Sequence, residues 1–272
     1  MTRWYEMAGL RLRLDGVLVE AALLEERYGP FAAAPGVPDL HLEVESSPGF
    51  FNPVAEKGRP GDSPFIEREG LSTLHRIDYE GVVVAPGHVR AKIDGTLGAV
   101  NGLVRHLLVP ALLHRGGLLV HASGLCVSGR VWAIAGPSGA GKTTACRHAP
   151  PFATVLGDEH LAVLPRGNAL WAWGTPIVGE LGQPGKPQGG PLQAIHFIEH
   201  ATQNRLTPLG KREGLRRLIP STVYYPRGRT WNGLALQACL TVADRVPAFR
   251  LEARGDGSFW SLLPAPSMEA RL

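Results

Sequence analysis

The sequence is poor in cysteine, and its three cysteines, Cys126, Cys146 and Cys239, are widely spaced and form no CxxC pair. An odd number of isolated cysteines argues against a disulfide framework or a cysteine-based metal site and is typical of reduced thiols. The first residues, MTRWYEMAGLRLRLDG, contain no apolar core of signal-peptide length, and His114 and Arg115 interrupt the longest apolar stretch. We therefore expect a cytoplasmic protein that does not enter a membrane.

Dense runs of one charge are also missing. The 28 Lys and Arg residues outnumber the 24 Asp and Glu residues, which gives a formal net charge of +4 and a pI of about 9.1, but both signs are spread along the chain. A scattered basic excess lacks the concentrated patch that nucleic-acid binding needs, so we expect no nucleic-acid partner. With 272 residues, 44% of them hydrophobic, the chain is long and apolar enough to bury a real core.

Two regions of the sequence differ in character. Residues 1–97 alternate apolar runs such as LRLRL and LHLEVE with the turn-rich segments SSPGFFNP and EKGRPGDSP, which predicts a small α/β region without a catalytic motif. Residues 98–115 carry apolar side chains at helical spacing, and we expect Pro110 to kink or break this helix. The helix leads into the second region, residues 98–272, which differs from the first in carrying recognisable motifs.

A glycine-rich loop follows the apolar run VWAIA, which is typical of a buried strand. The stretch GPSGAGKT at 136–143 fits the phosphate-binding pattern G-x-x-x-x-G-K-[ST]. Glycines let backbone N–H groups turn inward around phosphates, Lys142 is expected to reach the β- and γ-phosphates, and the Thr143 hydroxyl is expected to hold Mg²⁺. We expect the nucleotide to be bound by Gly136, Pro137, Ser138, Gly139, Ala140, Gly141, Lys142, Thr143 and Thr144.

A hairpin is predicted just before this loop, because the β-type runs GLLVHASGLCV and RVWAIA are separated by the turn dipeptide Ser-Gly at 128–129. If Val127 pairs with Arg130, the register places His121 beside Gly136 at the mouth of the loop. There it would donate to a phosphate oxygen or tune a carboxylate base. The alternative is that His121 is a hydrogen-bonded core histidine, which is the usual role of a lone histidine on an apolar strand.

The helix after the loop is predicted to be short, because two prolines at 150–151 prevent it from running past Ala149. GTPases, ABC ATPases and nucleoside kinases usually have a longer helix here. The following stretch, FATVLGDEHLAVL, places Asp158 and Glu159 between two apolar runs. One acid is suited to bind Mg²⁺ and the other to orient or deprotonate an attacking hydroxyl, although Gly-Asp-Glu is also ordinary composition for an exposed turn.

Further along, the segment LGQPGKPQGGP at 181–191 is rich in Gly and Pro and predicts a loop. The runs QAIHFIEHA and LTVADRVPAFRLEARGDGSFW indicate further strands and helices, and we expect the late helices at residues 211–219 and 231–244. No internal repeat is present.

Three of these motifs in this order, HASG, GPSGAGKTT and GDEHLAVL, resemble HPr kinase/phosphorylase and the wider group of HPr-kinase-like serine kinases. Later pieces, WGTPIVGE, PLQAIHFIEHATQNRL and VPAFRLEARGD, are similar to HPr-kinase-related proteins found beside peptide-modification genes, including kinases of lasso-peptide precursors. The resemblance implies a core shared with phosphoenolpyruvate carboxykinase, which would account for the short helix. It also implies Mg-ATP-dependent phosphorylation of a serine hydroxyl.

The resemblance assigns roles by motif position. His121 matches the family histidine before the loop, Lys142 and Thr143 match its phosphate and metal residues, and Asp158 matches the first acid, the proposed base. Glu159 stands where the family usually has a second Asp and would serve the metal. The E-x-R-G-x-G segment of HPr kinase/phosphorylase is not evident after residue 176, so we expect a kinase without the phosphorylase activity.

We therefore expect an α/β protein with a P-loop core of the phosphoenolpyruvate-carboxykinase type. Residues 1–97 would form a small N-terminal α/β region, and residues 98–272 an HPr-kinase-like nucleotide-binding kinase domain. Its catalytic residues would be Asp158, His121 and Lys142, its metal residues Thr143 and Glu159, and its cofactors ATP and Mg²⁺. The acceptor would be a peptide or small protein, such as a ribosomally made precursor peptide, and homo-oligomerisation is left open. Two alternatives are a kinase for a small metabolite such as free serine, and an inactive nucleotide-dependent peptide-binding module.

Overall fold

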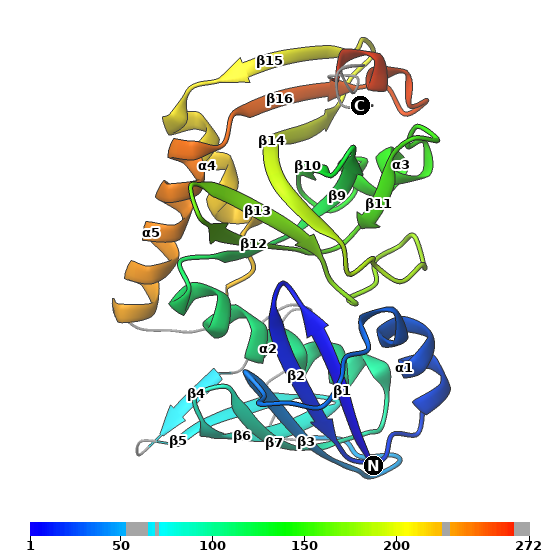
Figure 1. Ribbon diagram of the computed structural model, residues 1–272, viewed down its shortest axis with the longest axis vertical. Helices are drawn as coiled ribbons and strands as arrows, with labels where there is room; N and C mark the ends of the chain where they lie inside the picture. Colours follow the sequence, from blue (N-terminus) through cyan, green and yellow to red (C-terminus); the bar gives the residue numbers. More distant parts are fainter. Residues whose placement is uncertain (53–64, 69–70, 225–228, 264–272) are drawn as a thin grey trace.

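A computed structural model describes residues 1–52, 65–68, 71–224 and 229–263 (Figure 1). These residues form a mixed α/β protein, mostly strands, with two curled sheets. The α/β class expected from the sequence is therefore confirmed. The turn-rich segment EKGRPGDSP at 56–64 lies outside the described residues.

The first sheet contains seven strands in the order β1-β2-β3-β7-β6-β5-β4. Its strands β2 and β3, and β3 and β7, run parallel, and its other neighbours are antiparallel. Helix α1 (Ala21–Tyr28) and the short helix η1 (Gly29–Phe31) lie between β2 and β3 in the chain. The strands are β1 (Thr2–Met7), β2 (Leu10–Asp15), β3 (Leu40–Ser46), β4 (Phe65–Arg68), β5 (Leu71–Arg76), β6 (Tyr79–Ala85) and β7 (His88–Ile93).

Alternating side chains give the first sheet one apolar and one polar face. In β2 and β3 the fully buried residues are Leu10, Leu12, Leu14, Leu40 and Leu42. The residues that alternate with them along the strands, such as Asp15, His41 and Glu43, are only partly buried and point to the opposite face. A shift of the register by one residue would bury these polar groups, so the pattern fixes the pairing.

Helix α2 (Leu97–His114) lies between the two sheets (Figure 1) and contacts β3 and β7 on one side. The Thr96 hydroxyl caps it by accepting from the Ala99 N–H at 3.3 Å. The expected break at Pro110 is wrong, because the helix continues through this residue. Among the described residues this helix alone is long and apolar enough for a membrane span, but 67% of it is buried, as in a core helix, and this burial offsets the cost of the proline.

The second sheet contains nine strands, and β14 (Gly189–His200) is its longest. This strand pairs in parallel with β10 (Arg130–Ala135) and β16 (Ala248–Ala253) and antiparallel with β13 (Ala169–Gly174). The late helices expected from the sequence are confirmed as α4 (Lys211–Ser221) and α5 (Arg229–Arg245). The remaining elements are β8 (Leu118–Val120), β9 (Ala122–Val127), α3 (Lys142–Arg147), β11 (Thr154–Gly157), β12 (Leu161–Arg166), β15 (Arg205–Leu209) and η2 (Ser258–Leu262).

The predicted hairpin is confirmed: β9 and β10 pair from Val127 opposite Arg130 to Ala122 opposite Ala135. The expected single strand GLLVHASGLCV, however, is divided at His121 into β8 and β9. The division arises because β8 pairs with β12 whereas β9 pairs with β10 and β11, and the His121 N–H donates to the Ser221 carbonyl at 2.7 Å.

The loop expected at 181–191 is shorter than predicted. Residues 181–188 form no helix or strand, but residues 189–191 belong to β14. Glycine permits this because a Cβ at Gly190 would lie 2.1 Å from the carbonyl oxygen of Gly129. The strand can therefore pack closely against the hairpin turn.

Candidate functional site

The glycine-rich loop at 136–143 connects β10 to α3. Gly139 and Gly141 have φ angles of +77° and +108°, in the left-handed region that favours glycine. The end of β14 supports the loop, since His200 Nε2 lies 2.7 Å from the Gly139 carbonyl oxygen. Helix α3 ends at Arg147, which confirms the short helix predicted from the prolines that follow it.

Lys142 is folded back onto this loop and is only 6% exposed. Its Nζ donates to the carbonyl oxygens of Gly136 at 2.9 Å and Pro137 at 3.0 Å, and it forms no ion pair within the described part of the chain. Burial lowers the pKa of Lys142, although the charges of Glu159, Glu180 and Asp158 act in the opposite direction. A buried ammonium group that donates only to neutral carbonyls favours an incoming anion.

Asp158 lies in the connection between β11 and β12 and is 2% exposed, so the exposed-turn alternative is wrong for this acid. Its Oδ2 accepts from the Thr143 hydroxyl at 3.2 Å and from the Leu181 N–H at 2.7 Å, and its Oδ1 accepts from the Gly179 N–H at 3.2 Å. The structure thus brings the last residue of the loop pattern against the first acid. It also brings the Gly- and Pro-rich loop onto the same carboxylate.

Glu159, the second acid, lies close to His121. The distance between His121 Nε2 and Glu159 Oε2 is 3.6 Å, and both side chains are about one third exposed. Burial raises the pKa of Glu159, but contact with His121 and the charges of His160, His121 and Arg105 lower it more, so the net pKa lies below the ordinary value. Glu159 is therefore an anion at neutral pH.

His121 does not pair with Gly136 as the register suggested, because the ladder of β9 and β10 ends at Ala122 and Ala135. The structure instead connects His121 to the acidic pair through Glu159. Its ring centroid lies 5.7 Å from that of His160, which is 4% exposed. Burial lowers the pKa of His160 to about 3, so this imidazole is neutral at physiological pH.

Two charged residues near the acids were not predicted from the sequence. Arg105 in α2 acts electrostatically on Glu159 and His160, and its buried Nε has no hydrogen-bond partner among the described residues. Glu180, in the loop after β13, acts on Lys142. One feature of the sequence could have indicated Arg105, since it is the single charged residue within the apolar run LGAVNGLVRHLLVP. Glu180 had no such feature beyond its place in WGTPIVGE.

The expectation that no E-x-R-G-x-G segment follows residue 176 is wrong, because residues 252–257 (EARGDG) have this pattern. The segment begins at the end of β16, where Ala253 pairs with His200, the residue in contact with the glycine-rich loop. The Arg254 N–H donates to Asn204 Oδ1 at 2.8 Å, and the Arg254 side chain pairs with Asp256 at 3.0 Å. The segment therefore lies at the same end of the sheet as the loop.

These features define a mixed α/β protein in which a glycine-rich loop, a buried lysine and an acidic pair meet at one end of a nine-stranded sheet. A family model described as SynChlorMet cassette protein ScmC matches residues 100–265. Because this match covers more than half of the 272 residues and includes the loop and both acids, the chain belongs to this family. A comparison with curated proteins finds no match.

Proposed function

We propose that the protein is a Mg-ATP-dependent kinase that transfers phosphate to a serine hydroxyl of a peptide or small protein. The observation that carries the proposal is the contact between Thr143 and Asp158 beside the buried Lys142. A glycine-rich loop that ends in a lysine and a hydroxyl, with a carboxylate in contact with that hydroxyl, is the set of groups that phosphoryl transfer uses. The motif resemblance to HPr-kinase-like proteins supplies the acceptor class.

The same proposal includes a core of the phosphoenolpyruvate-carboxykinase type. It is supported by the six-residue helix α3 and by the mixed sheet in which β10 lies between antiparallel β9 and parallel β14. A longer helix would be expected after the loop of a GTPase or an ABC ATPase. The short helix is one of several features of the sequence that together resemble HPr-kinase-like proteins.

ATP would be held by the loop and by Lys142, whose Nζ would exchange the carbonyls of Gly136 and Pro137 for phosphate oxygens. Thr143 and a carboxylate of the acidic pair would hold Mg²⁺, and their oxygen donors fit this ion. When bound, Mg²⁺ supplies positive charge beside the phosphates. Arg105 adds a cation on the side of Glu159.

In the proposed transfer, the serine oxygen forms a bond to the γ-phosphorus of ATP while the bond from that phosphorus to the ADP oxygen breaks. The hydroxyl proton passes to a carboxylate of the acidic pair. The motif resemblance makes Asp158 this base and Glu159 the metal residue. The 3.2 Å contact between Thr143 and Asp158 favours the reverse, with Glu159 as the base beside His121.

Intact-mass analysis after incubation with Mg-ATP and a panel of serine-containing peptides, including peptides encoded beside the gene, tests the proposal. We expect one peptide to gain a single phosphate on serine, and we expect Lys142→Ala to abolish the gain. Lys211→Ala is the matched control, because this exposed lysine pairs with Asp244 on the helices α4 and α5. If ATP binds but neither a peptide nor free serine gains phosphate, the kinase proposal is wrong.

A further inference from the structure

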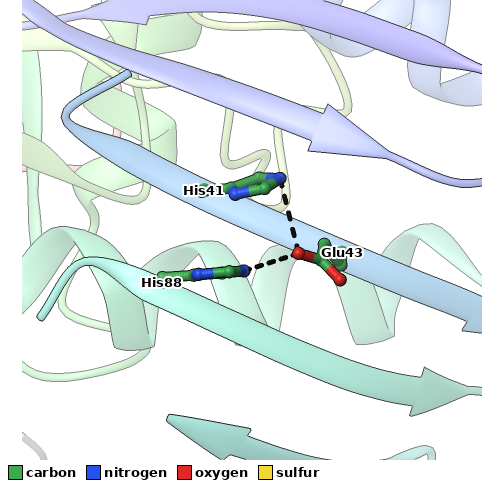
Figure 2. Close-up of side chains that lie close together, drawn as sticks. All are labelled: His41, Glu43 and His88. Carbon is green, nitrogen blue, oxygen red and sulfur yellow. Dashed lines mark hydrogen bonds and ion pairs between the residues drawn. The ribbon is translucent and has the colours of Figure 1, made fainter. Parts of the chain in front are cut away.

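A second group of functional side chains lies on the polar face of the first sheet, away from the residues that the proposed kinase uses. Strands β3 and β7 are parallel neighbours, and their register places His41 opposite His88. Glu43 lies two residues after His41 and therefore on the same face of the sheet. Figure 2 shows both imidazole rings pointing toward the Glu43 carboxylate.

The ligand atoms of these three residues converge on one point. The distance from His88 Nε2 to Glu43 Oε1 is 2.7 Å, and the distance from His41 Nε2 to the same oxygen is 3.9 Å. The ligand atoms of the three residues all lie within 4.8 Å of one another. The two rings are stacked with centroids 4.2 Å apart, and the Nε2 atom of each faces the Glu43 carboxylate (Figure 2).

We propose that His41, Glu43 and His88 bind one divalent transition-metal ion, with Zn²⁺ the best match to two imidazoles and a carboxylate. Ligand atoms that bind Zn²⁺ tetrahedrally at about 2.0–2.1 Å are separated from one another by about 3.3 Å. The observed separations of 2.7 and 3.9 Å fall on either side of this value, so small side-chain rotations reach the required geometry.

Neighbouring side chains orient the three ligands. Arg90 Nε donates to Glu43 Oε2 at 2.8 Å, which leaves Oε1 facing the two rings. Asp15 Oδ2 lies 2.7 Å from His41 Nε2 and is itself paired with Arg13. When the metal takes both Nε2 atoms, each imidazole proton moves to Nδ1, and Asp15 is then free to serve as the fourth ligand.

An ion can reach this position from solvent. The side chains of His41, Glu43 and His88 are 19%, 29% and 24% exposed. A groove of about 780 Å³ opens beside them, and its lining carries four carboxylates and three cationic side chains. The lining therefore has one formal negative charge in excess, which favours entry of a cation.

Isothermal titration of the full chain, stripped of metal with EDTA, with ZnCl₂ tests this site without nucleotide. We expect one Zn²⁺ per chain and at least about 100-fold weaker binding for the His41→Ala/His88→Ala double variant. Glu43→Gln, which keeps the side-chain size, should weaken binding about 10-fold or more. His75→Ala is the matched control, because His75 lines the same groove but is not one of the three ligands. Equal binding by the double variant and the wild type would overturn the proposal.

X-ray absorption spectroscopy at the zinc K-edge, applied to the wild-type protein, tests the site without depending on how the variants fold. The expected spectrum contains nitrogen and oxygen neighbours at about 2.0–2.1 Å, with two imidazoles and no sulfur. Sulfur neighbours at about 2.3 Å would place the metal on cysteine instead and would refute the site. Absence of tightly bound zinc in the titration would show that the cluster is only an ion-pair network.

Discussion

Two groups of two histidines and one glutamate occur in this protein, one on strands of the first sheet and one in connections between strands of the second sheet. In the groove group (His41, Glu43 and His88), both Nε2 atoms face one carboxylate oxygen. In the loop group (His121, Glu159 and His160), only His121 faces the glutamate, while His160 is buried and neutral. The same residue types therefore form a converging cluster in one place and a diverging one in the other.

Their neighbours explain the different chemistry that we propose for them. The loop group adjoins Lys142, Asp158 and the glycine-rich loop, which together favour phosphates and a metal held by oxygen atoms. The groove group is held by Arg90 and Asp15 on a rigid pair of strands, which favours a metal held by nitrogen atoms. Residue types alone do not define a site, because the convergence of their atoms decides what they bind.

The largest expected effect separates the two acids beside the loop. We expect Asp158→Asn to lower the rate of phosphopeptide formation by about 1,000-fold or more and to raise the Mg²⁺ concentration needed for half-maximal rate, because Asp158 lies against Thr143. Glu159→Gln should lower the rate by about 100-fold without changing the Mg²⁺ requirement. If only Glu159→Gln changes that requirement, the roles are those implied by the motif resemblance.

A second prediction asks whether the two groups belong to one cooperative unit. Leu108 in α2 is fully buried, and this helix contacts strands of both sheets. Leu108→Ala should lower the free energy of unfolding by about 3 kcal/mol in a single urea transition. Leu236→Ala, at a site that is 49% exposed, should change it by less than about 1 kcal/mol. Two separate transitions would mean that the sheets unfold independently.

A third prediction concerns the histidines that are buried in the interior. Burial lowers the pKa of His106 from 6.5 to about 3 and that of His196 from 6.5 to about 4. Below pH 6.5 these histidines take up protons in the unfolded chain but not in the folded protein. The free energy of unfolding is therefore highest above this pH and falls as the pH decreases toward 4. At pH 5, His106 alone should lower the free energy of unfolding by up to about 2 kcal/mol relative to neutral pH.

Urea titrations at several pH values measure this loss. His106→Gln should weaken the dependence between pH 6.5 and 4, because glutamine does not titrate there. A dependence that is unchanged in this variant would assign the acid sensitivity to other groups.

The smallest expected effect concerns the loop that holds Asp158. A Cβ at Gly179 would lie 2.8 Å from Asp158 Oδ1, so Gly179→Ala should displace either the loop or the carboxylate. We expect about a 10-fold loss of transfer rate, equal to about 1.4 kcal/mol, with intact folding by circular dichroism. Gly210→Ala is the control, since nothing lies within 4 Å of a Cβ there. Equal rates for both variants would show that this support for Asp158 is unnecessary.

Local patterns in the sequence were sufficient to predict much of the structure around the glycine-rich loop. The hairpin register followed from the dipeptide at 128–129, the short α3 from the prolines after it, and the position of Asp158 from the apolar runs on both sides. Each prediction depends on residues close together in the chain. The division of the strand at His121 was missed because it depends on β12 and on residue 221, which are distant in sequence.

The groove group could not be predicted in this way. His41 and His88 become neighbours only through the parallel pairing of β3 with β7, and no turn between these strands fixes their register. The contribution of Arg105 to the loop site has the same origin, because α2 reaches the acids only through the packing of the whole chain. Tertiary contacts of this kind leave no short motif.

The position of β14 also sets a limit on biosynthesis. This strand pairs with β10, which precedes it, and with β16, which follows it, and its last residue, His200, supports the glycine-rich loop. A ribosome releases β10 and the loop long before it releases β16. The nascent chain therefore carries the complete loop sequence without its supporting sheet, and the sheet around the end of β14 is complete only after residues near 253 have left the exit tunnel.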